Sequence, residues 1–180
     1  MKMLFAAMMM TLAAATASAG EPAEKNATTD YEPMKLFERF AGRAMRGEGT
    51  GPDGKPVVNI ATWKFIMDGR AVQSDHKLEG GTYGGRTIYF YDEGGEKYIY
   101  HYFTNAGFHT MGEVTPTDNG FASVEKVINH PNFSEVRGEM FFDGDVIRVT
   151  STHVDKEGKL SETKEGFVYR FIDDPGALFQ

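Results

Sequence analysis

Between residues 43 and 172 the chain alternates apolar and polar residues in short, aromatic-rich runs. A period of two residues is typical of a half-buried β-strand. Glycine, asparagine or proline follows nearly every run, as tight turns between strands require. The expected strands are residues 43–50, 57–67, 70–78, 87–91, 98–104, 109–115, 121–128, 136–142, 146–154 and 161–172. With a turn about every 10–14 residues, this ladder predicts an all-β fold, an up-and-down antiparallel β-barrel of about ten strands.

A short helix is expected in front of the first strand, over residues 31–40. Met34 and Phe37 recur at helical spacing, Pro33 suits the first turn, and Gly42 ends the pattern. Such a helix would cover one end of the barrel. No second helical pattern lies between the strands, which argues against βαβ folds. Residues 20–30 are polar and aperiodic, so we expect them to form a disordered tether. We expect residues 31–180 to form one domain.

The first nineteen residues carry the features of an export signal. Lys2 supplies a positive charge, an apolar stretch follows over residues 3–12, and Ala17-Ser18-Ala19 is a small-residue cleavage site. This pattern predicts a secretory signal peptide over residues 1–19, too short for a membrane span. We therefore expect a periplasmic or extracellular protein. The chain has no cysteine, so its stability would come from an ordinary core without disulfides.

Charge narrows the class of partner. Among charged residues the predicted cleavage removes only Lys2, which leaves 18 basic and 26 acidic residues and a net charge of −8. Nucleic-acid binding needs basic patches, so we expect no nucleic-acid partner. A membrane-embedded barrel would show an apolar outer face and a polar lumen. Here the strands combine one clearly charged face with one bulky apolar face, so we expect a barrel that is not embedded in a membrane.

The charged positions identify which strand face points outward. Lys64, Lys77, Arg148 and Lys164 belong to the polar face of their strands, which turns their immediate neighbours inward. The same alternation places Asn59, Ala61, Val72, Ser74, Ile147, Val149 and Ser151 on the inner face. The residues that we predict to bind a ligand there are Trp63, Phe65, His76, His153, Glu165 and Tyr169. An aromatic wall with a few polar insertions is typical of a small-molecule cavity.

Several runs resemble those of uncharacterised, exported, lipocalin-like bacterial domains. They are residues 42–54 (GRAMRGEGTGPDG), 84–87 (GGRT), 91–92 (YD) and 102–108 (YFTNAGF). The resemblance covers nearly the whole mature chain and implies a calycin-type barrel. The chain is more distantly similar to the calycin group of lipocalins, fatty-acid-binding proteins and haem-binding nitrobindins. Gly47 and Gly49 match the Gly-x-Trp-x-Gly-x-Gly opening of nitrobindins, but Ala44 or Met45 stands where the tryptophan is expected.

The histidines are the candidates for chemistry. Resemblance to nitrobindins implies that His153 could ligate a haem iron. His76 could be a second polar contact, and Glu165 could pair with either histidine as an acid and base. His101 and His109 flank a turn. A three-residue loop would oppose Phe103 to His109 and put both histidines on one face, whereas a two-residue loop would separate them. We therefore assign no metal site.

Three functions follow from these observations. The first is an exported barrel that holds a small apolar or aromatic ligand in its interior. The second is a nitrobindin-like haem protein with a histidine axial ligand, and the third is a small acid/base enzyme. A Gly-x-Gly-x-x-Gly match at residues 49–54 is excluded as a dinucleotide site, because a strand follows it where such a site needs a helix.

Overall fold

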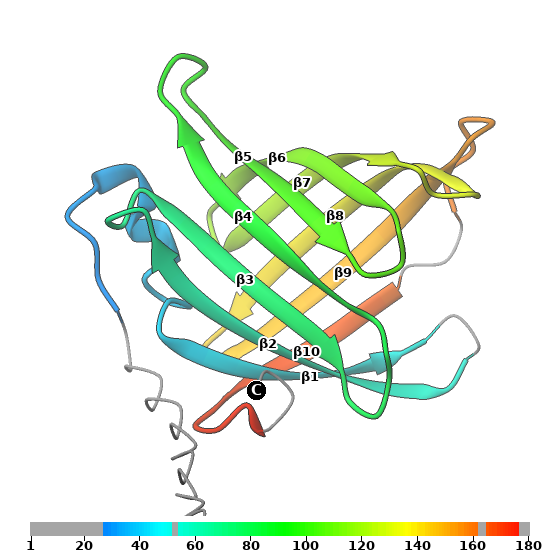
Figure 1. Ribbon diagram of the computed structural model, residues 1–180, viewed down its shortest axis with the longest axis horizontal. Helices are drawn as coiled ribbons and strands as arrows, with labels where there is room; N and C mark the ends of the chain where they lie inside the picture. Colours follow the sequence, from blue (N-terminus) through cyan, green and yellow to red (C-terminus); the bar gives the residue numbers. More distant parts are fainter. Residues whose placement is uncertain (1–26, 52–53, 162–164, 177–180) are drawn as a thin grey trace, which may run out of the picture.

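The computed structural model describes residues 27–51, 54–161 and 165–176. The predicted signal peptide, residues 1–19, and residues 20–26 of the predicted tether lie outside the described residues. In the described part of the chain, ten antiparallel strands form a closed barrel in which each strand pairs with its sequence neighbours (Figure 1). Pairing of the first strand with the last closes it. The predicted all-β, up-and-down barrel is therefore confirmed.

The strands lie close to their expected positions. They are β1 (Arg43–Thr50), β2 (Pro56–Ile66), β3 (Ala71–Leu78), β4 (Gly84–Asp92), β5 (Lys97–Thr104), β6 (His109–Thr117), β7 (Gly120–Ile128), β8 (Phe133–Asp143), β9 (Val146–Asp155) and β10 (Glu165–Ile172). The strand β4 begins earlier than expected, because Gly84 and Gly85 pair with β3 and do not form a turn. The strand β6 runs through Pro116, which pairs with Phe121 of β7.

The predicted helix is a single short 3-10 helix, η1 (Glu32–Phe37), with a proline in its first turn. It is shorter than the expected range, because the hydrogen bonds beyond Phe37 are those of turns. The amide of Phe40 donates to the carbonyl of Phe37. Gly42 then takes a positive φ of 76°, which suits glycine. Its amide donates to the Trp63 carbonyl and joins the turn to β2.

The helix and its following turn close one end of the barrel with aromatic side chains. Phe37 and Phe40 are at most 1% exposed. The ring of Phe40 stacks on Trp63 at a centroid distance of 4.8 Å, and Phe37 stacks on Phe121 at 5.8 Å. The chain is also attached before η1, where the hydroxyl of Thr29 donates to the Gly69 carbonyl. The expectation that the helix covers a barrel end is met by this packing.

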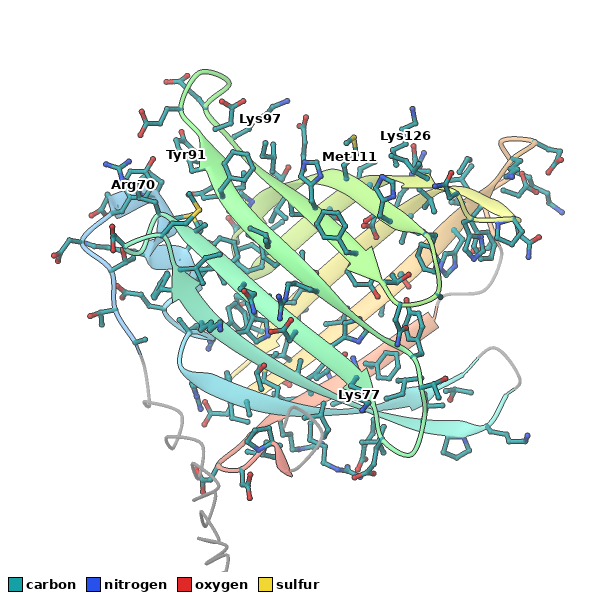
Figure 2. The ribbon with its side chains drawn as sticks, viewed as in Figure 1. Arg70, Lys77, Tyr91, Lys97, Met111 and Lys126 are labelled. Carbon is teal, nitrogen blue, oxygen red and sulfur yellow. The ribbon has the colours of Figure 1, made fainter. Side chains whose placement is uncertain are left out.

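Side chains alternate between the interior and the surface. Asn59, Ala61, Trp63, Val72, Ser74 and Ile147, all expected on the inner face, are buried. On the outside, Met111 and Lys126 project away from the barrel from neighbouring strands (Figure 2). In the described residues, no helix has the length and apolar character needed to cross a membrane.

Candidate ligand-binding site

A cavity of about 300 Å³ lies inside the barrel. Phe37 of η1 and Trp63 of β2 line it next to the closed end of the barrel, and we call these two residues the aromatic floor. All ten strands contribute to its wall. Its aromatic lining consists of Phe37, Trp63, Tyr89, Tyr100, Tyr102, Phe121 and Tyr169. Polar groups enter from several sides, among them Asn59, His76 and Glu125. The cavity therefore combines a large apolar surface with a few fixed polar groups, which is the usual composition of a small-molecule site.

Trp63 forms part of the floor and is the chain's single tryptophan. Its indole lies between the rings of Phe40 and Tyr89, which stack on it at 4.8 and 5.4 Å. Among the described residues, the indole Nε1 is the one buried side-chain nitrogen or oxygen with no hydrogen-bond partner. The packing seals this nitrogen from solvent. Trp63 is also one of the residues that line the cavity.

A chain of hydrogen bonds runs along one wall. The Asn59 amide nitrogen donates to the Tyr169 hydroxyl at 2.7 Å, and the Asn59 amide oxygen lies 3.1 Å from His76 Nδ1. His76 Nε2 lies 2.7 Å from the Tyr102 hydroxyl, which in turn lies 2.7 Å from the Tyr83 hydroxyl. The chain thus connects side chains from β10, β2, β3 and β5 and from the turn that follows β3.

Two inward-facing glycines make this chain possible. Gly47 lies between Tyr169 and Asn59, and a Cβ atom added to it would come within 2.3 Å of the Tyr169 ring. Gly85 has the same role for Tyr102, whose ring would lie 2.4 Å from an added Cβ. Each tyrosine ring therefore lies over a glycine and reaches a residue two strands away. Any larger residue at either position would push the ring out of place.

His76 is neutral in this environment. Its Nδ1 faces the Asn59 oxygen, so Nδ1 carries the proton and Nε2 accepts from the Tyr102 hydroxyl. Burial lowers the pKa of His76 to about 4, while the neighbouring Asp75 carboxylate acts in the opposite direction. Burial also raises the pKa of Tyr169 to about 12. The wall is therefore a network of uncharged donors and acceptors at neutral pH.

Glu125 supplies a carboxyl group to the same cavity from β7. Thr110 donates to it from β6, and the Tyr100 hydroxyl bonds to it from β5. Burial raises the pKa of this carboxyl, and these two hydrogen bonds lower it. Sequence reasoning missed Glu125, although Lys126 beside it is clearly an outward residue. Alternation from Lys126 was the signal that could have placed Glu125 inside.

The six residues predicted to bind a ligand are only partly brought together. Trp63, His76 and Tyr169 line the cavity. Phe65 packs against the buried core cluster and is not among the lining residues. Glu165 begins β10 opposite Ser151, but its side chain lies outside the described residues. Its predicted pairing with a histidine therefore stays a prediction.

His153 lies beyond the cavity. It pairs with Val136, which does line the cavity. Its ring stacks on Phe133 at 4.6 Å, and Phe133 stacks on His130 at 4.7 Å. Within the cavity, both ring nitrogens of His76 are already hydrogen-bonded. The described residues thus offer no uncommitted imidazole nitrogen in the cavity, so they do not fit a haem held by a histidine axial ligand.

His101 and His109 share the outer face of the barrel. Phe103 opposes His109 in the register, as expected for the three-residue loop of Asn105, Ala106 and Gly107. Phe103 lies between the two imidazoles, with centroid distances of 6.3 and 6.2 Å. In the described part of the chain, no three histidine, aspartate or glutamate side chains are grouped so as to hold a metal ion.

Comparison with known proteins does not assign the chain to a family. No protein-family model matches it, and no curated protein sequence matches it. The closed ten-strand antiparallel barrel is compatible with a calycin-like fold. The resemblance to exported lipocalin-like domains stays a prediction.

Proposed function

We propose that the protein binds a small, mainly apolar or aromatic molecule inside its barrel. The observation that carries this proposal is the cavity of about 300 Å³ inside the barrel, with several aromatic side chains in its wall. Protein interiors contain few voids larger than a water molecule. A cavity of this size therefore supports a ligand-binding role.

The size of the cavity limits the ligand. A cavity of about 150 Å³ holds benzene, and pockets for drug-sized molecules begin at about 300 Å³. The barrel cavity, also about 300 Å³, therefore suits a molecule of one or two rings. Phe37 and Trp63 line the cavity and provide apolar surface for such a molecule. The Asn59–His76 network and Glu125 supply the polar contacts that would orient it.

The predicted signal peptide supports a place for this activity outside the cytoplasm. We propose that the mature chain meets its ligand in the periplasm or the extracellular space. The proposal assigns no reaction. A binding module of this kind would hold, carry or sequester its ligand.

Calorimetric titration with naphthol tests the proposal, because this neutral two-ring molecule matches the cavity in size. We expect saturable binding of one naphthol per chain with a negative heat-capacity change. The variant Ser151→Phe places a ring in the cavity from β9 and should abolish binding. The control Thr152→Phe adds the same ring at the next residue of β9, opposite Arg137, and should bind normally. Absence of saturable binding, or equal binding by both variants, would contradict the proposal.

A further inference from the structure

Glu125 occupies an unusual position for a glutamate. Its neighbour Lys126 points outward (Figure 2), and Glu125 itself faces the cavity. The strand β7 lies five strands from β2 in either direction around the barrel, so Glu125 stands on the wall opposite Asn59 and Trp63. A carboxylate has about four acceptor sites. Thr110 and Tyr100 use two of them, so acceptor capacity remains for a ligand.

Among the described residues, this carboxyl group has no positively charged partner in the cavity. Of the described residues that line the cavity, none is lysine or arginine. His76 is the one basic side chain in that lining, and burial lowers its pKa to about 4, so it is uncharged near neutral pH. The ion pairs of basic residues in the described part of the chain, such as Arg86 with Asp75 and Lys97 with Glu113, use partners outside the cavity lining. Glu125 is half-buried. Removing a carboxylate from water without a cation is costly, and a cation supplied by a ligand would offset that cost.

Aromatic rings surround the same carboxyl group. The Tyr100 hydroxyl is hydrogen-bonded to it. The pKa values of Tyr89 and Tyr100 are both raised, mainly by burial and secondly by the negative charge of Glu125. Tyr102 and Phe121 also line the cavity. The faces of aromatic rings attract an organic cation, most strongly where water is excluded. The net charge of −7 for the whole chain favours cations further.

We propose that the ligand is a small aromatic amine, bound as its ammonium ion with the charged nitrogen against Glu125 and its ring on the aromatic floor. This inference rests on the ligand-binding function proposed above and specifies the ligand's chemical class. A ligand of this class satisfies the carboxyl group and the apolar wall together. A carboxylic acid of the same shape would meet the charge of Glu125 and be repelled.

Three probes of one shape and different charge test this inference by calorimetric titration of the full chain. They are naphthylmethylamine, which is cationic, naphthylmethanol, which is neutral, and naphthoic acid, which is anionic. A charge-assisted hydrogen bond corresponds to about a tenfold to hundredfold gain in affinity. We therefore expect the amine to bind the wild-type protein about ten to a hundred times more tightly than the alcohol, and the acid to bind most weakly.

Two variants separate the local effect of Glu125 from the overall charge. Glu125→Gln keeps an acceptor for Thr110 and should bring the amine and the alcohol to similar affinities. Glu113→Gln changes the net charge equally at the outer surface, where Glu113 pairs with Lys97, and should retain the preference for the amine. Because the wild-type preference is measured with ligands alone, the test holds even if Glu125→Gln is unstable.

The outcomes distinguish this inference from the function on which it rests. Binding of the alcohol with equal or weaker binding of the amine would overturn the amine assignment and leave a neutral-ligand barrel. Failure of naphthol, naphthylmethanol and naphthylmethylamine alike to bind would overturn both. A preference for the amine that survives in Glu125→Gln and disappears in Glu113→Gln would place the cation on the outer surface and overturn the inference.

Discussion

Acidification should destabilise the barrel through His76. Burial lowers the pKa of this imidazole from its usual 6.5 to about 4. As the pH falls, the unfolded chain therefore takes up a proton on His76 before the folded chain does. The stabilisation tied to the neutral imidazole is complete above about pH 6.5 and is lost as the pH falls toward about 4.

The magnitude follows from the difference between the two pKa values. At 1.36 kcal/mol per pKa unit, the total loss in free energy of unfolding is about 3 kcal/mol. About 2 kcal/mol of this loss falls between pH 7 and pH 5. Glu125 acts in the opposite direction, because burial raises its pKa. The stabilisation tied to the protonated Glu125 is complete below the pKa of this carboxyl in the unfolded chain. It is lost as the pH rises through the higher pKa of the carboxyl in the folded chain.

Urea unfolding, followed by circular dichroism between pH 7 and pH 4.5, measures this effect. The variant His76→Gln is uncharged at every pH and keeps a side chain that can bond to Asn59 or Tyr102. Subtracting its unfolding free energy from that of the wild type cancels Glu125 and the other carboxylates. The difference should shift by about 2 kcal/mol between pH 7 and pH 5. A difference that is the same at both pH values would refute the neutral, buried imidazole.

Three further substitutions test the packing. Phe40→Ala removes a ring fully buried against Trp63 and should lower the free energy of unfolding in urea by about 3–5 kcal/mol. The control Phe103→Ala changes a side chain that is 49% exposed and should lower it by less than about 1 kcal/mol. Tyr169→Phe leaves the amide of Asn59 without its acceptor and should cost about 1–3 kcal/mol by the same assay; an unchanged midpoint would show that the bond is absent in solution. Gly47→Ala should lower the melting temperature, since the Tyr169 ring must move, at a cost of about 1–3 kcal/mol, and wild-type stability would contradict this close contact.

Alternation along the strands predicts which face of each strand is inward, because most side chains on the inner face are shielded from solvent and those on the outer face are not. It places Trp63, His76 and Tyr169 correctly in the interior. Alternation does not predict depth along the barrel. His153 shares a face with Val136, yet it lies where the rings of Phe133 and His130 stack. The position of a residue along the barrel axis depends on the stagger between strands, which cannot be predicted from the local pattern of residues in one strand.

The strand β7 shows why part of the candidate site escaped prediction. Its outer face carries Val124, which is 52% exposed, and its inner face carries Ser123 and Glu125. At these three positions the usual pattern is reversed, because the cavity wall itself needs polar groups. Glutamate is also usually exposed, whereas Glu125 is half-buried. In the sequence of this strand, Lys126 is therefore the residue that identifies the outer face, whereas Val124 and Glu125 by themselves indicate the opposite orientation.

The glycines at positions 47 and 85 show a related limit. In sequence, Gly85 is typical of a turn, and it belongs to a glycine-rich stretch after β3. In the structure it pairs within β4 and leaves room for the Tyr102 ring to reach His76. Such a role depends on the residue opposite, which belongs to another strand. Only the register between strands shows it.

Native mass spectrometry of the protein, purified without denaturation from the compartment where it is produced, tests the central claim most directly. We expect a fraction of wild-type chains to carry one small molecule of a size that suits a cavity of about 300 Å³, and we expect Ser151→Phe prepared in parallel to carry none. Thr152→Phe should retain the adduct. Bare wild-type protein that also fails to take up added naphthol or naphthylmethylamine would contradict a ligand-binding barrel.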